Sequence, residues 1–147
     1  MKSLFEPDTY LTTRNRLNQL DENSEKLWGK MSVGQMLHHC QGPLNIMLEK
    51  DHYGMKPNWF AKLLFKKMLY NDTSFRKNMP TAKFLKEIEP RDFSTEVNTI
   101  NELLDEFHNN RDREEWKPHP GFGYFTNEQW GKMQYKHLDH HLRQFGV

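Results

Sequence analysis

The residues of this chain whose type and spacing best suit chemistry are two histidines near its C-terminal end, His137 and His141. Residues four positions apart on an α-helix lie one above the other on the same face. Two imidazoles placed in this way can bind one metal ion, as they do in helical zinc sites. With 8 histidines in 147 residues, such a pair also arises by chance, and a histidine suits the negative end of a helix. The pair therefore indicates either a metal site that needs a further ligand or a basic helix end.

A third histidine from the front of the chain, His39, is the candidate that completes a metal site. The capping box Ser32–Gln35 predicts a helix over residues 33–50. At about 100° per residue, His39 lies on the same face as Met36 and Ile46. We therefore expect His39 on a mostly apolar face that points into the protein.

Pro43 interrupts this predicted helix. Proline has no N–H to donate, so the carbonyl of His39 loses its usual partner four residues on. The helix either bends at Pro43 or ends near Gly42 and restarts, and the sequence leaves both alternatives open.

Periodicity and capping residues predict the other elements. Between residues 71 and 91, Pro80 and Pro90 favour an extended excursion. The further helices are expected over residues 8–20 with Asp8 or Thr9 as cap, 59–70 (WFAKLLFKKMLY), 93–110 with Ser94 as a possible cap, and 127–145 after the capping box Thr126–Gln129.

These elements predict an all-α protein with one domain, residues 1–147. No segment alternates apolar and polar residues as a strand would. The architecture we expect is a four-helix bundle with a short extra helix and an excursion between the second and third long helices. In such bundles metal sites form from side chains of facing helices, which is where the three histidines would lie.

Composition narrows the expected partners and location. The net charge of +1 gives no reason to expect a nucleic-acid surface. The single cysteine, Cys40, excludes an internal disulfide and fits a reducing compartment. The start MKSLFEPDTY has no apolar signal core, and no stretch is apolar enough for a membrane span. We therefore expect a cytoplasmic protein.

Three short blocks together resemble the DinB/YfiT-like superfamily, and more narrowly a small branch with an HPxFG motif before the last helix. They are WGKMSVGQMLHHC at 28–40, HPGFG at 119–123 and HLDHHLRQFG at 137–146. The resemblance implies an up-down-down-up four-helix bundle that is often dimeric. It also implies three histidines that bind a divalent metal ion, commonly zinc or nickel.

The resemblance places the metal ligands on particular residues of this chain. The second-helix ligand falls on His39 rather than His38, and the HxxxH motif falls on His137 and His141. His140 matches a position that is not a ligand in the superfamily.

The predicted function is a metal-dependent enzyme that acts on a small molecule. Three imidazoles leave a tetrahedral ion one open position, where it can activate water or a low-molecular-weight thiol. Relatives in the superfamily include thiol S-transferases and putative hydrolases, so the reaction would be of S-transferase or hydrolase type. The chain has no HExxH motif, and Asp139 points away from the histidine face, which tells against a peptidase.

Further side chains are candidates for supporting roles. Gln35, Gln134 and Gln144 lie on inner faces, where they could accept from the ring nitrogens that do not bind metal. His119 of HPGFG is either a site residue or a cap of its loop.

Two alternatives to an enzyme stay open. The first is a non-enzymatic, stress-associated metal-binding bundle, which a fourth protein ligand such as His119 would favour. The second is a helical interaction module with structural histidines. In that case the basic amphipathic segment 59–70 would dock a partner or a membrane surface.

Overall fold

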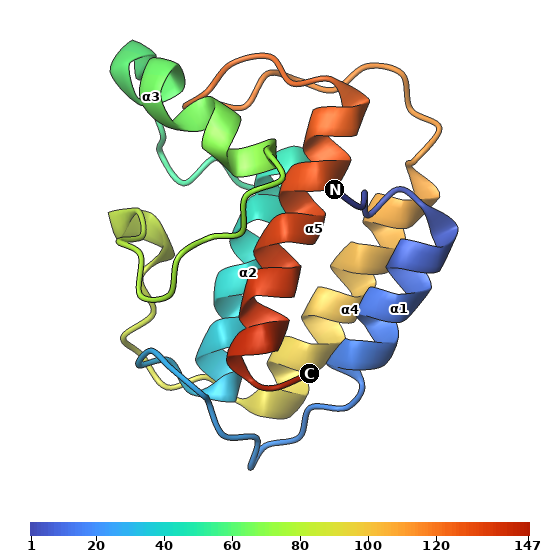
Figure 1. Cartoon of the computed structure of the whole chain (residues 1–147), viewed down its shortest axis with the longest axis vertical. Helices are drawn as coiled ribbons and strands as arrows, with labels where there is room; N and C mark the ends of the chain where they lie inside the picture. Colours follow the sequence, from blue (N-terminus) through green and yellow to red (C-terminus); the bar gives the residue numbers. More distant parts are fainter.

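The computed structural model describes residues 1–147 and contains only helices as regular structure (Figure 1). The all-helical class expected from the sequence is confirmed. The elements are α1 (Pro7–Leu17), α2 (Val33–Met47), α3 (Trp59–Tyr70), the single 3₁₀ turn η1 (Lys83–Leu85), α4 (Phe93–Asn109) and α5 (Asn127–Gln144).

Four of the helices pack side by side around the core. Helix α2 contacts α4 and α5, and α1 contacts the same two helices. In Figure 1, α1 and α5 run down the view while α2 and α4 run up it. The space between them is filled by 21 buried apolar residues, among which Trp130, Phe107 and Phe125 are the largest fully buried side chains. This core holds α2 against α5, the two helices that carry the candidate metal ligands.

The two helices that carry the candidate ligands begin where their capping boxes predict. The hydroxyl of Ser32 accepts from the backbone N–H of Gln35, whose side chain in turn accepts from Ser32 N–H. Thr126 and Gln129 make the same reciprocal pair at the start of α5. These local contacts satisfy N–H groups that the first turn leaves free.

The expected ends of α1 and the expected cap of α4 need correction, whereas α3 spans the expected residues Trp59–Tyr70. Helix α1 begins at Pro7, ahead of the expected caps Asp8 and Thr9, because proline suits a first position that needs no N–H donor. It also ends at Leu17 rather than at residue 20. The cap of α4 is Asp92, two residues before the expected Ser94, and its carboxylate accepts from the N–H of Thr95.

Helix α2 runs without interruption through Pro43, so it does not end near Gly42 and restart. It is three residues shorter than expected at its far end. Leu48 is the C-cap residue of α2, and Glu49, which follows it, has a positive φ of 62°. The chain then leaves the bundle towards α3.

Residues 71–92 form the expected excursion, which η1 alone interrupts. Figure 1 shows η1 as a short olive-green coil on the side of α2. The ring of Phe84 stacks on Tyr53 with 5.4 Å between centroids, which fixes η1 near the end of α2. No helix of the protein combines the length and the apolar character needed to cross a bilayer.

Candidate metal centre

Three histidines meet between α2 and α5. One ring nitrogen from each of His39, His137 and His141 lies within 4.8 Å of the other two. The Nε2 atoms of His39 and His137 are 3.1 Å apart, and the three pairs of ring centroids are 4.7 to 5.0 Å apart. The structure thus brings together the three side chains that the sequence predicted to converge.

The orientation of the His39 ring is fixed by a backbone carbonyl. Its Nδ1 lies 2.8 Å from the carbonyl oxygen of Leu85 in η1. Because a carbonyl oxygen can only accept, Nδ1 carries the proton and the neutral ring keeps its lone pair on Nε2. That lone pair faces Nε2 of His137, which is 3.1 Å away.

Two successive hydrogen bonds fix the ring of His141, with the proton on Nδ1 as in His39. The side-chain amide of Gln144 donates through Nε2 to the carbonyl oxygen of Trp28 at 2.8 Å, so its Oε1 faces the other way. This Oε1 lies 2.8 Å from Nδ1 of His141 and accepts its proton. The lone pair of His141 is therefore also on Nε2.

His137 completes the cluster without a partner outside it. Its Nδ1 is buried and makes no hydrogen bond. Its Nε2 either donates to the lone pair of His39 or offers a lone pair of its own to a shared cation. Tetrahedral zinc with Zn–N bonds of about 2.0–2.1 Å would hold neighbouring nitrogens about 3.3 Å apart. The observed 3.1 Å is close to that spacing, so the residues present fit a divalent ion.

Burial keeps all three rings neutral, as metal ligands must be. Desolvation lowers the pKa of His141 to about 3, and the neighbouring His39 adds to this. Desolvation lowers the pKa of His137 well below its ordinary value. It also lowers the pKa of His39, although the hydrogen bond to Leu85 and the charge of Glu87 oppose it. His39 and His141 are buried, whereas His137 keeps partial exposure, so the cluster lies at the edge of the core.

Two glycines allow the supporting groups to approach. A Cβ on Gly42 would lie 2.3 Å from Cδ2 of Leu85, so the absence of a side chain lets η1 reach His39. A Cβ on Gly29 would lie 2.4 Å from Nε2 of Gln144, and this glycine also has a φ of +83°. A side chain at Gly42 would displace Leu85, which accepts from His39, and a side chain at Gly29 would displace Gln144, which accepts from His141.

Of the three glutamines expected to support the rings, only Gln144 does so. Gln134 instead donates to the carbonyl of Pro43 at 2.9 Å, and Gln35 closes the helix cap and donates to the carbonyl of Glu89. The partner of His39 is the backbone of Leu85. Every residue has a backbone carbonyl, so no residue type in the sequence could indicate that Leu85 would be this partner.

His119 does not join the cluster, and its contacts are those of the loop cap. Its Nδ1 accepts from the N–H groups of Gly121 and Phe122 at 3.0 and 3.2 Å. Its backbone pairs with that of Gly123, and its ring stacks on Trp130. Burial, followed by the charge of Lys66, lowers the pKa of His119 to about 4.

Two carboxylates that the sequence analysis did not single out lie beside His38. Its Nδ1 is 3.0 Å from a carboxylate oxygen of Glu96, which also accepts from Gln41 at 2.6 Å. Its Nε2 is 3.8 Å from Glu87, a largely buried carboxylate from the excursion that also pairs with Arg91. No carboxylate joins the three histidines. The candidate donor set is therefore entirely nitrogen.

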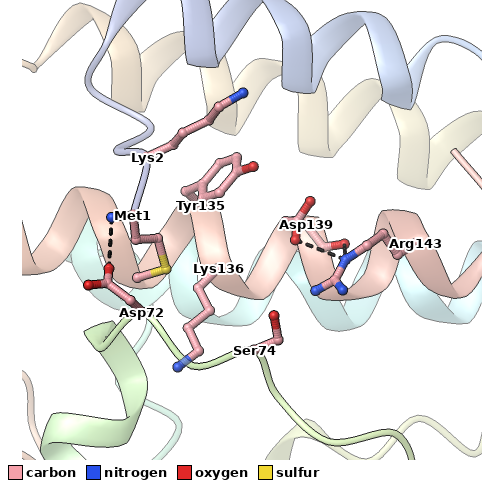
Figure 2. Close-up of a pocket in the computed structure, with 8 residues that line it drawn as sticks. All are labelled: Met1, Lys2, Asp72, Ser74, Tyr135, Lys136, Asp139 and Arg143. Carbon is pink, nitrogen blue, oxygen red and sulfur yellow. Dashed lines mark hydrogen bonds and ion pairs between the residues drawn. The ribbon is translucent and has the colours of Figure 1, made fainter.

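A separate polar pocket of about 240 Å³ lies along α5 (Figure 2). Asp139 pairs there with Arg143 at 2.9 Å, and the N-terminal amine pairs with Asp72 at 2.7 Å. None of the three clustered histidines lines it, so it is not part of the candidate metal centre. Its lining residues are Met1, Lys2, Asp72, Ser74, Tyr135, Lys136, Asp139 and Arg143.

Comparison with known proteins places the chain in one family. Residues 5–146 match the family described as "Protein of unknown function (DUF1569)", and because this match covers nearly the whole chain, the protein belongs to that family. No curated protein and no solved structure matches the chain. The family description assigns no activity.

Proposed function

We propose that His39, His137 and His141 bind one divalent metal ion, zinc or nickel, and that the protein is a metal-dependent enzyme acting on a small molecule. The observation that carries this proposal is the convergence of the three rings. Hydrogen bonds that His39 donates to the carbonyl of Leu85 and that His141 donates to the side chain of Gln144 direct the lone pairs of these two rings into the cluster. Buried lone pairs that face one another need a hydrogen-bond donor or a cation between them, and a shared cation meets this need for all three rings.

The proposal includes membership of the DinB/YfiT-like superfamily. The opposite directions of the α1–α5 and α2–α4 pairs in Figure 1 are compatible with its up-down-down-up bundle. The HPGFG block and the spacing of the histidines support the same assignment. A homodimer, which the resemblance also implies, is measurable by sedimentation of the purified protein.

When bound, the ion would supply a Lewis acid that favours the deprotonated form of water or a thiol. The chain's own residues would hold the ion and orient the histidine rings that bind it. Leu85 and Gln144 fix the tautomers of two ligands, and burial of His39 and His141 keeps bulk water from these rings. An all-nitrogen donor set leaves the ion its full charge, which suits an S-transferase or a hydrolase better than a storage site.

The alternative of a closed, non-enzymatic metal site receives less support. It needs a fourth protein ligand, and the candidate for that role was His119. The Nδ1 of His119 is occupied by two backbone N–H groups of its own loop. The fourth position is therefore left for water or substrate in this proposal.

Elemental analysis tests the metal site directly. We expect about one zinc or nickel ion per chain in the purified protein and in a control variant at the exposed His52, His52→Ala. We expect loss of the ion in His39→Ala and in His137→Ala. Stoichiometric metal in either of these two variants would remove that residue from the site. Loss in the control would indicate a different site.

A second assay tests catalysis. The protein is incubated with a low-molecular-weight thiol and an electrophilic acceptor, and the conjugate is measured before and after chelation. Conjugation or hydrolysis that depends on His137 and on the ion supports the enzyme. Activity that persists after chelation would reject the metal-dependent reaction, and metal without any turnover would favour the non-enzymatic bundle.

A further inference from the structure

Helix α3 presents an apolar face that nothing in the protein covers. None of its residues is buried. Five of its large apolar side chains are between 49% and 72% exposed. They are Trp59, Phe60, Leu63 and Leu64, which share one side of the helix, and Phe65, which lies on another side. Single exposed apolar residues are ordinary, but a group of this size on one short helix marks an interaction surface.

The apolar face is held outward by polar contacts on the inner side of α3. The backbone N–H of Asn58, just before the helix, donates to the carbonyl of Gly121 at 3.3 Å. After its last turn, the carbonyl and side-chain oxygens of Asn71 accept from the buried ammonium of Lys136 at 3.2 and 2.7 Å. Lys66 donates to the carbonyl of Tyr124 between these two ends. Both ends of α3 are therefore tied to the α5 side of the protein, and Figure 1 shows α3 outside the bundle at the upper left.

The charged side chains of the segment that carries this face all have one sign. Residues 55–70 contain four lysines and no aspartate or glutamate, in a chain whose net charge is only +1. Lys62 and Lys67 are exposed on α3 together with the apolar side chains. An exposed group of apolar side chains that contains a tryptophan and is interspersed with lysines matches the chemistry of an anionic membrane surface, where acyl chains lie beneath negative headgroups.

We infer that α3 docks the protein on anionic lipid membranes, with Trp59, Leu63 and Leu64 inserted at the headgroup level. The size of the surface favours lipid over protein. Twelve helical residues span only about 18 Å, and a helix is about 10 Å wide. Such a strip offers a few hundred Å², well short of the roughly 800 Å² per partner in a stable protein interface. A projecting helix needs no matching groove in a lipid surface.

Vesicle binding tests this inference. The full chain is sedimented with vesicles of phosphatidylcholine alone and with vesicles of an equal mixture of phosphatidylcholine and phosphatidylglycerol. We expect binding only to the mixed vesicles, loss of binding in the double variant Leu63→Asp/Leu64→Asp, and unchanged binding in Leu11→Asp. Leu11 is an exposed leucine on α1, so it controls for the same substitution on another helix. Because all three leucines are exposed, the variants should fold, and circular dichroism checks this.

Two further measurements separate lipid from other occupants. Lys62→Gln/Lys67→Gln should weaken binding by about fivefold per lysine at low salt. The fluorescence of Trp59 should shift to the blue on binding, and Trp59→Phe should remove that shift. Failure of the folded protein to bind mixed vesicles, or binding that survives the double aspartate change, would overturn the inference. A protein dimer that the same aspartate change dissociates would assign the face to a second copy instead.

Discussion

The metal-free protein should lose stability steadily as the pH falls from about 7 to about 5. The reason is that His141 is buried beside His39, which lowers its pKa to about 3 from an ordinary value of 6.5. Between these two values the unfolded chain binds a proton that the folded chain does not. The contribution of neutral His141 is therefore complete above about pH 6.5 and declines as the pH falls towards the folded-state pKa.

The size of the effect follows from the shift. One histidine whose folded-state pKa is about 3 costs about 2 kcal/mol of unfolding free energy between about pH 7 and about pH 5. His39 and His137 have lowered pKa values as well and add to the slope in the same direction. Since a domain of this size has a total stability of about 5–15 kcal/mol, the change is a large fraction of it.

The assay is denaturant unfolding in the presence of a chelator at several pH values. His141→Gln should show a shallower slope than the wild-type protein, because the residue that takes up the proton is gone. His52→Gln, at an exposed position, is the matched control and should keep the wild-type slope. Equal slopes in the wild-type protein and the His141 variant would refute the claim that His141 is buried and neutral.

Three other substitutions test the groups around the cluster. Gln144→Leu removes the acceptor that orients the candidate ligand His141, so zinc affinity in a competition with a chromogenic chelator should fall by about 10- to 100-fold. Gly42→Val should push Leu85 away and lower zinc affinity too. His119→Ala should cost about 1 kcal/mol of stability in urea unfolding, because two partly buried N–H groups lose their acceptor, and metal content should be retained. Loss of metal in this variant would return His119 to the site.

Local signals predicted the parts of the fold that depend on neighbouring residues. The capping boxes at Ser32 and Thr126 act within three residues, so the starts of α2 and α5 were predicted correctly. The cap of α4 was misplaced because Asp92 and Ser94 are both good capping residues only two positions apart. The place of η1 beside α2 depends on a contact between Gly42 and a residue far along the chain, which no local pattern contains.

The candidate site was predictable for side chains with a distinctive chemistry and spacing. His137 and His141 share a helix face by periodicity alone, and the resemblance selected His39 over its neighbour. The carbonyl of Leu85 and the nearby carboxylate of Glu87 were missed, since both come from the irregular excursion. Their positions depend on how the whole chain folds back onto α2.

Because the candidate ligands lie far apart along the chain, a bound metal ion would also cross-link distant parts of the protein. His39 and His137 lie 98 positions apart, so an ion bound by both would act as a cross-link that closes a loop of most of the chain. By chain-entropy arguments such closure stabilises by about 4–5 kcal/mol. Helix α1 lies ahead of this loop and is not tethered by it. Loading with zinc should therefore slow amide hydrogen exchange from α2 to α5 and leave exchange in α1 comparatively fast.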